Sequence, residues 1–291
     1  MARREEDMRF GFDTKPFHPT RFYQLTPEEL FDAMRAISRA HFDGFETMDV
    51  NVSPFFKERR KFINILSETK LQLAAIHVWG DFYTIYKGIH PKIWWRRRRW
   101  LRRLIPSILE FASAVGCERL LIEGPLERTE GANERDIASV ARGLNKVGRL
   151  CDDFGVEATY HPFNHRQIIS SRDRLKKLCE LTDPSFVHLT IDVQKAVNRG
   201  IDPTGIISEY IERTDHIHLR DIKKDGKPVE IGEGTIDLVG IYNLLKTLGY
   251  NDWVIVQHGL PALKECHSTP SQSVERAGKY ISEYLLSHAR T

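Results

Sequence analysis

The sequence predicts a (β/α)8 barrel, the α/β fold also called a TIM barrel, formed by one domain that spans residues 1–291. Two observations favour this fold. Short β-rich segments alternate with helical patterns along the whole chain, and no low-complexity tract or Gly/Ser linker marks a domain boundary. An open doubly wound sheet is the alternative, and it fits less well because no glycine-rich fingerprint follows the first strand.

Eight segments have the composition and the length of strands. In chain order they are MRFGF (8–12), GFETM (44–48), LQLAAIHV (71–78), RLLIE (119–123), VEATYH (156–161), FVHLTID (186–192), HIHL (216–219) and WVIVQ (253–257). Eight strands separated by helical segments are the number that closes this barrel, whose active site lies at the C-terminal ends of the strands.

Several helical segments carry recognisable start signals. The sequence TPEE (26–29) predicts an N-cap followed by proline in the first turn, and Asp202-Pro203 repeats the device. After the last strand, SVERAGKYISEYLL (273–286) has the apolar spacing of a closing amphipathic helix.

Segment 93–105, IWWRRRRWLRRLI, interleaves arginine with tryptophan. Such a combination can bind phosphates and stack on bases. Its apolar residues nevertheless fall roughly on one stripe of a helix, so we interpret it as a helix with most arginines in solvent or at a subunit contact. Pro106 then either kinks this helix or opens a second helix that ends near Gly116.

The overall composition excludes several classes of protein. Forty-three Lys and Arg against forty Asp and Glu give a formal charge of +3, which is too balanced for a dedicated nucleic-acid binder. The charged N-terminus and the absence of a stretch of ~20 apolar residues predict a cytoplasmic protein without membrane contact. The four cysteines lack CxxC spacing and are expected to be free thiols.

Polar residues stand at or near the C-terminal ends of seven of the eight predicted strands. They are Glu46, His77, Glu123, His161, Asp192, His218 and Gln257. One such residue is commonly a loop residue or a cap, but seven that converge on one barrel mouth indicate a functional site. Within DHIHLRD (215–221), alternation along a strand places His216, His218 and Arg220 on one face.

These segments resemble the xylose-isomerase-like TIM barrels, the sugar phosphate isomerase/epimerase superfamily that includes inosose dehydratases, ketose 3-epimerases and apurinic endonucleases. The resemblance runs almost end to end. It is carried by GFETMD (44–49), HPFN (161–164), IDVQKAVNRGIDP (191–203), RTDHIHLRDI (213–222), IGEGTIDL (231–238) and LGYNDWVIVQ (248–257).

The resemblance implies one divalent metal held at the ends of strands five to eight. The matching positions are His161, Asp192, His218 and Gln257. Family members usually carry glutamate at positions 161 and 257, so the formal ligand charge falls from three negatives to one. Imidazole ligands favour manganese, zinc, cobalt or iron over magnesium. A barrel that has lost its metal and uses these groups as hydrogen bonders remains the alternative.

In the family, the metal coordinates a carbonyl and a neighbouring hydroxyl of the substrate, while glutamates transfer a proton. Gln257 cannot serve as a general base. Because proton abstraction needs only one base, we expect a lyase or dehydratase acting on a keto-sugar or keto-cyclitol, with isomerisation or epimerisation as the alternative. The candidate catalytic residues are Lys195, His165 and Glu123. Lys195 stands where the family often has a histidine. We expect it either to contact substrate as a cation or to act as a base, and the alternative is a solvated loop lysine.

The expected substrate contacts are His77, Arg220, Glu46 and Glu233, and the alternative for Glu233 is a turn carboxylate. The resemblance places His216 one layer below the proposed ligand His218, hydrogen-bonded and inert. Asp221 is expected to anchor the following loop.

The partners expected are a small sugar or cyclitol and further copies of the chain. Two other functions stay open. One is the metal-bearing subunit of a partner-dependent complex such as a C-glycoside deglycosidase, with Trp79, Trp94 and Trp95 as an aromatic wall. The other is a phosphodiesterase that resembles apurinic endonucleases, but the additional Asp-x-His after strand seven is not found.

Overall fold

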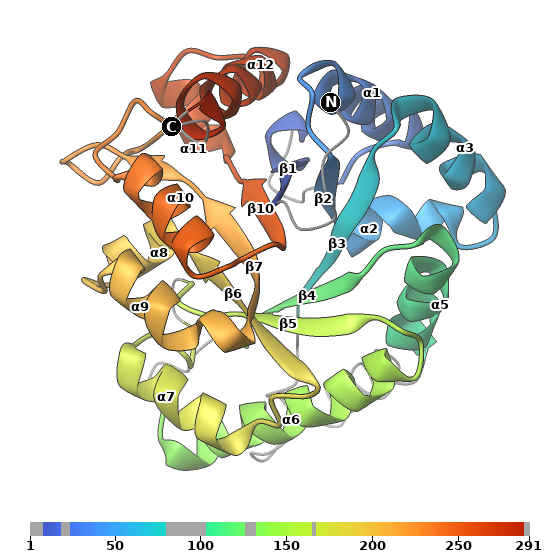
Figure 1. Cartoon of the computed structure of the whole chain (residues 1–291). Helices are drawn as coiled ribbons and strands as arrows, with labels where there is room; N and C mark the ends of the chain where they lie inside the picture. The colour runs from blue at the N-terminus through green and yellow to red at the C-terminus, as the bar shows by residue number, and fades with distance from the viewer. Residues whose placement is uncertain (1–7, 19–23, 80–102, 126–131, 165–166, 288–291) are drawn as a thin grey trace.

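The computed structural model describes residues 8–18, 24–79, 103–125, 132–164 and 167–287. Eight parallel strands close into a barrel, and helices surround it (Figure 1). The (β/α)8 fold expected from the sequence is therefore confirmed.

All eight predicted strands are present, with ends that differ by at most two residues from the predicted ones. They are β1 (Arg9–Asp13), β2 (Gly44–Met48), β3 (Gln72–Trp79), β4 (Arg119–Glu123), β5 (Glu157–His161), β6 (Val187–Asp192), β7 (Thr214–Leu219) and β10 (Trp253–Val256). Around the barrel the order follows the chain, and β1 pairs with β10 to close it. Every residue of β2, β4, β7 and β10 is buried, as expected for strands covered on both faces.

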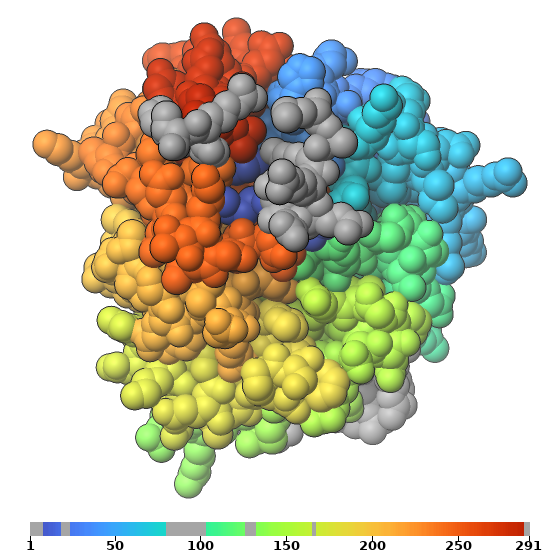
Figure 2. Space-filling model, in the orientation of Figure 1, coloured from blue at the N-terminus to red at the C-terminus, as the bar shows by residue number. Residues whose placement is uncertain are grey.

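Helices follow the strands around the outside of the barrel. They are α1 (Pro27–Arg39), α2 (Asp49–Val52), α3 (Arg59–Thr69), α5 (Ile105–Val115), α6 (Glu134–Asp152), α7 (Arg172–Leu181), α8 (Val193–Asn198), α9 (Pro203–Tyr210), α10 (Leu238–Thr247), α11 (Leu260–Glu265) and α12 (Pro270–Tyr280). In the space-filling view, the segments follow one another around the rim in chain order, from blue through green and yellow to red (Figure 2). No helix in the described part of the chain is both long and apolar enough to cross a membrane.

The predicted helix starts are confirmed. Thr26 caps α1 by accepting a hydrogen bond from the backbone of Glu29, and Asp202 caps α9. The closing helix α12 begins at Pro270, three residues before the predicted start. Pro106 opens α5, which ends at the left-handed Gly116, whereas most of segment 93–105 lies outside the described residues. The four cysteines are free thiols.

A short hairpin that the sequence did not predict follows β7. It consists of β8 (Asp221–Ile222) and β9 (Pro228–Val229), and it leads into the loop GEG (232–234). The Asp221 carboxylate accepts hydrogen bonds from the backbone N–H groups of Gly232, Gly234 and Ile236. A Cβ at position 234 would lie 2.1 Å from Oδ1 of Asp221, so glycine is required there. Asp221 thus anchors the loop, as expected.

A network of ion pairs lies at the N-terminal ends of the strands. Arg119 is almost fully buried at the start of β4, 3.1 Å from Asp215 and 2.5 Å from Asp252. Glu118 pairs with Arg119 at 2.6 Å and with Arg9 at 2.6 Å. The network joins residues at the starts of four strands, β1, β4, β7 and β10. It lies at the end of the barrel opposite the predicted site.

Glu118 gives this network a pH dependence. Burial alone would raise the pKa of Glu118, but Arg9 and Arg119 hold it at about 2. A depressed carboxyl pKa stabilises the fold above the unfolded pKa of about 4.3, and this contribution is lost as the pH falls towards 2. Glu118→Gln is therefore expected to cost about 1 kcal/mol of unfolding free energy at pH 7, since water screens the part-exposed carboxylate, and much less at pH 2.5. Urea unfolding at both pH values measures this difference.

Glu110→Gln is the control, because Glu110 is an exposed carboxylate on the surface of α5 that pairs with Arg59 at 3.2 Å. An equal loss of stability at pH 7 and pH 2.5 for Glu118→Gln would contradict the pH assignment.

Candidate metal and active site

The polar strand ends predicted from the sequence meet at the C-terminal end of the barrel. All seven side chains are buried, and the most exposed residue among them, Glu123, is 3% exposed. Their order in the barrel brings groups from strands far apart in the chain into contact, such as Glu46 of β2 and His218 of β7, 2.8 Å apart. We call the set Glu46, His77, Glu123, His161, Asp192 and His218, together with Lys195, the mouth ring.

Neighbouring members of the mouth ring lie within ion-pair distance of one another. Nε2 of His77 is 2.8 Å from Oε2 of Glu123, and its Nδ1 is 3.5 Å from Oε1 of Glu46. Across the mouth, Nε2 of His161 is 3.6 Å from Oδ2 of Asp192. The same Asp192 oxygen is 3.9 Å from Nδ1 of His218, so the contacts close into a ring.

Three of the four predicted metal ligands form a compact group, His161, Asp192 and His218. One ligand atom from each lies within 4.8 Å of the other two. Nδ1 of His218 is buried and has no hydrogen-bond partner among the described residues. This buried nitrogen has no hydrogen-bond partner and faces a carboxylate and a second imidazole. A cation bound between the three groups would give it a partner, so these residues fit a divalent metal.

The protonation of the group also suits a metal. Burial lowers the pKa of His161 and of His218, so both imidazoles are neutral near pH 7. Burial alone would raise the pKa of Asp192, but Arg220, His161 and Lys195 hold it well below its usual range. Metal ligands must be deprotonated, and all three are.

Glu46 lies behind His218 and not on the surface of the mouth. Its side chain is fully buried, and one of its oxygens is 2.8 Å from Nε2 of His218 and 3.0 Å from Nε2 of His216. A hydrogen on Nε2 of His218 is donated to this carboxylate, which leaves the lone pair on Nδ1. These contacts are those of a group that orients His218, and the expected direct contact of Glu46 with substrate stays a prediction. The placement of His216, buried beneath His218, agrees with the expectation.

Gln257 lies beside the group, with its amide nitrogen directed at carboxylates. Nε2 donates to Asp13 at 2.6 Å and to Glu46 at 3.4 Å. A glutamate at this position would place a third carboxylate against these two, so the amide avoids that repulsion. Its role as a fourth ligand stays a prediction.

Lys195 lies in the first turn of α8 and points into the mouth ring. Its side chain is only 12% exposed, and Nζ is 3.4 Å from Oε1 of Glu123. Nζ is also 3.3 Å from Nε2 of His161 and 3.9 Å from Oδ2 of Asp192. Burial lowers the pKa of Lys195, although Glu123 and Asp192 oppose the shift. The alternative of a solvated loop lysine is wrong.

Two residues of the mouth were missed by the sequence reasoning, Asp13 and Lys15. Asp13 ends β1, one residue beyond the predicted strand. Nζ of Lys15 is 2.9 Å from Asp13 and 2.9 Å from Nδ1 of His77. The signal was present in the sequence, because a charged residue directly follows the first strand. With Asp13, a polar residue lies at or near the C-terminal end of each of the eight barrel strands.

The other predicted site residues divide into two groups. Arg220, 19% exposed, lies at the mouth, where its guanidinium donates to the backbone of Gln257 and is 3.4 Å from Asp192. Trp79 is 46% exposed and stacks on His77 with ring centroids 6.3 Å apart. Glu233, in contrast, is an exposed turn carboxylate 3.5 Å from Arg276, which agrees with the alternative of a turn carboxylate, and its predicted contact with substrate stays a prediction. The loop carries it away because Asp221 binds the flanking glycines.

His165, Trp94 and Trp95 lie outside the described residues, so their predicted roles are untested.

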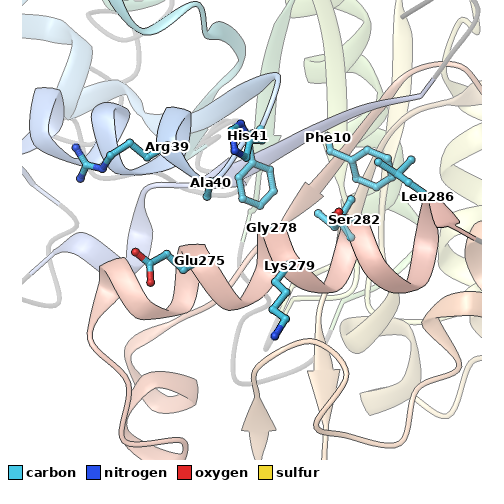
Figure 3. Close-up of a pocket in the computed structure, with 11 residues that line it drawn as sticks. Phe10, Arg39, Ala40, His41, Glu275, Gly278, Lys279, Ser282 and Leu286 are labelled. Atoms are coloured by element: carbon cyan, nitrogen blue, oxygen red, sulfur yellow. The ribbon is translucent and has the colours of Figure 1, made fainter. Parts of the chain in front are cut away.

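A separate hollow of about 470 Å³ lies between the end of α1 and α12, towards the N-terminal ends of the strands (Figure 3). Phe10, Phe42 and Leu286 give it apolar walls, and Arg39 and Lys279 stand at its edge. No member of the mouth ring lines it. It is a crevice between helices, distinct from the chemistry at the barrel mouth.

Comparison with known proteins gives one family and a consistent set of relatives. The model of the xylose isomerase-like TIM barrel family matches residues 34–274. The inosose dehydratase of Clostridium tetani (strain Massachusetts / E88) is 29% identical over 282 residues, which cover 89% of this chain and 91% of that protein.

Many solved structures share the fold, among them the following two. A D-tagatose 3-epimerase-like protein has a TM-score of 0.75 and 16% identity, covering 97% of this chain and 99% of its own. The IOLI protein with a binding zinc atom has a TM-score of 0.75 and 14% identity, covering 96% and 99%.

Proposed function

Because the chain belongs to the xylose isomerase-like TIM barrel family, we propose that it is a metal-dependent enzyme acting on a keto-sugar or keto-cyclitol. The reaction begins with removal of the proton beside the carbonyl and continues by elimination, as in a lyase or dehydratase. Isomerisation or epimerisation from the same first step is the alternative. The inosose dehydratase relative and the epimerase-like neighbour support this class of enzyme.

The observation that carries the proposal is the convergence of His161, Asp192 and His218, with the unpartnered Nδ1 of His218 among the described residues. Two imidazoles and one carboxylate favour manganese, zinc, cobalt or iron over magnesium. The zinc atom bound by a protein of the same fold supports this choice. Gln257 is the proposed fourth ligand, through its amide oxygen.

When bound, a divalent cation would polarise the substrate carbonyl and stabilise the negative charge that develops as the neighbouring proton leaves. The chain's own residues supply the rest. Asp192 and the two histidines hold the cation, and Glu46 orients His218 from behind. Their burial keeps water away from this side of the site, which strengthens each electrostatic contact.

Lys195 and Glu123 are the proposed proton carriers. The Lys195 side chain is the more exposed of the pair, 12% against 4% for Glu123, and its nitrogen contacts both Glu123 and the proposed ligand His161. Glu123 lies 3.4 Å from Nζ and is proposed to take the ammonium proton, which leaves Nζ as the neutral amine that accepts the proton from the substrate. Arg220 and His77 flank this pair and are proposed to hold substrate hydroxyls.

Hydrogen exchange in D₂O tests the function directly. The protein is stripped with a chelator, reloaded with manganese or zinc, and mixed with keto-cyclitols and keto-sugars. ¹H NMR is expected to record metal-dependent loss of the signal of the proton beside the carbonyl, because elimination and isomerisation share this step. Exchange that survives chelation would refute the metal dependence, and no exchange with any keto-sugar or keto-cyclitol would refute the reaction.

Glu46→Gln is expected to weaken metal binding by about 10-fold to 100-fold, because the uncharged amide holds His218 less firmly and lowers its basicity. Titration of the metal against a fluorescent chelator measures the affinity. Glu233→Gln, which changes the same group at the protein surface, is the matched control and should bind metal like the wild type. Equal affinities for all three proteins would show that Glu46 does not orient the ligand.

A further inference from the structure

Lys195 lies against the same atoms that form the proposed metal group. Its Nζ is 3.3 Å from Nε2 and 3.4 Å from Nδ1 of His161. It is also 3.9 Å from Oδ2 of Asp192, the oxygen that faces both histidines of the group. The ammonium therefore contacts two of the three proposed ligand residues, His161 and Asp192.

The backbone of Lys195 is tied to one of these ligands. Asp192 is the N-cap of α8, and its Oδ1 accepts a hydrogen bond from the backbone N–H of Lys195 at 2.9 Å. This hydrogen bond holds the lysine Cα beside the ligand group, so we expect the side chain to move more than the backbone when a metal binds. Glu123 supplies its third contact, outside the ligand group.

At these distances, the Lys195 ammonium and a bound metal cation would repel each other strongly. A metal bonded to Nε2 of His161 lies about 2.1 Å from that atom. Since Nζ is 3.3 Å from the same atom, the two cations would be at most about 5.4 Å apart with the lysine in place. This separation is shorter than the screening length of about 8 Å in physiological salt, and both groups are shielded from water.

From this geometry we infer that the Lys195 ammonium and the divalent metal compete for the mouth ring, so that metal entry displaces the lysine side chain outward. Lys195 lowers the affinity for metal, and once displaced, its nitrogen faces the substrate. The inference rests on the proposed function, since it requires that His161, Asp192 and His218 hold a metal.

Lys195→Met tests the competition, because it keeps most of the side-chain volume and removes the charge. We expect its affinity for Mn²⁺ or Zn²⁺, measured by chelator competition and calorimetry, to be at least 10-fold higher than that of the wild type. Lys195→Arg keeps the charge and should give no gain. Lys195→Gln provides a second neutral side chain if the methionine variant does not fold.

Lys15→Met is the matched control. Lys15 carries the same charge and is 11% exposed, against 12% for Lys195, but it contacts Asp13, His77 and Glu46 and none of the three ligand residues. Its substitution should change the metal affinity less than 3-fold.

The outcomes separate the inference from the proposed function. Binding by the wild type with no gain in Lys195→Met or Lys195→Gln overturns the competition and leaves the proposed metal site standing, and so does an equal gain in Lys15→Met. Binding by Lys195→Met alone supports the competition. No binding by any of these proteins overturns both proposals.

Discussion

Asp192→Asn is expected to abolish metal binding in the working range and to lower the rate of proton exchange by about 10³-fold, because Lewis-acid stabilisation of the transition state is worth several kcal/mol. Asp192 is the one carboxylate in the group of His161, Asp192 and His218. Without its charge, the cation meets two neutral imidazoles and the neighbouring Arg220 guanidinium, 3.4 Å from this side chain.

The asparagine variant should still fold, since its side-chain oxygen can accept the hydrogen bond from the backbone of Lys195 that starts α8. Thermal unfolding therefore accompanies the kinetic measurement. Asp225→Asn, at an exposed turn, is the control and should retain full activity. If Asp192→Asn exchanges the substrate proton at the rate of the wild type, the metal group does not take part in the reaction.

Arg119→Met is expected to destabilise the protein by about 3–5 kcal/mol, because it leaves buried charge without a partner. Arg119 is 3% exposed and lies 3.1 Å from Asp215, which is also buried. It further pairs with Asp252, Glu118 and Glu157, so four carboxylates lose a common cation. The lost ion pairs lie at the N-terminal ends of the strands, so the substitution should leave the chemistry at the mouth unchanged.

Urea unfolding followed by circular dichroism measures the cost. Arg149→Met, which removes an arginine with a 63% exposed side chain paired with Asp183, should cost less than about 1 kcal/mol. Equal costs for the two substitutions would mean that the buried network does not stabilise the barrel.

The fold could be predicted from the sequence because each strand carries its own local signal. Hydrophobic runs of five to eight residues, caps such as Thr26, and proline at helix starts are properties of short segments. The predicted fold then implied that the polar residues at the strand ends lie together, since the C-terminal ends of all parallel strands of a barrel meet at the same end. This is why His161, Asp192 and His218 could be expected together before the structure placed them there.

The roles of individual side chains at the mouth could not be predicted in the same way, because they depend on depth along the barrel axis. Glu46 lies at the centre of β2 and contacts His218, whereas Glu123 ends β4 and contacts Lys195. Lys15 reaches His77 only because a short turn follows β1. Glu233 is carried to the surface by the loop that Asp221 holds.

Gln257 illustrates how contacts explain a departure from a family pattern. From the sequence it was only an amide at a position where a carboxylate is usual. The structure places its N–H group against Asp13 and Glu46, and Lys15 pairs with the same Asp13. On this side of the mouth the carboxylates therefore lie on β1 and β2, and the amide follows β10.

Anomalous scattering from crystals soaked in Mn²⁺ or Zn²⁺ tests the central claim most directly. The expected result is one strong peak at the mouth, about 2.0–2.3 Å from Nε2 of His161, Oδ2 of Asp192 and Nδ1 of His218, with Lys195 swung outward. A peak held by other residues, or no peak at the mouth in crystals soaked at saturating metal, would contradict the assignment of this group as the metal site.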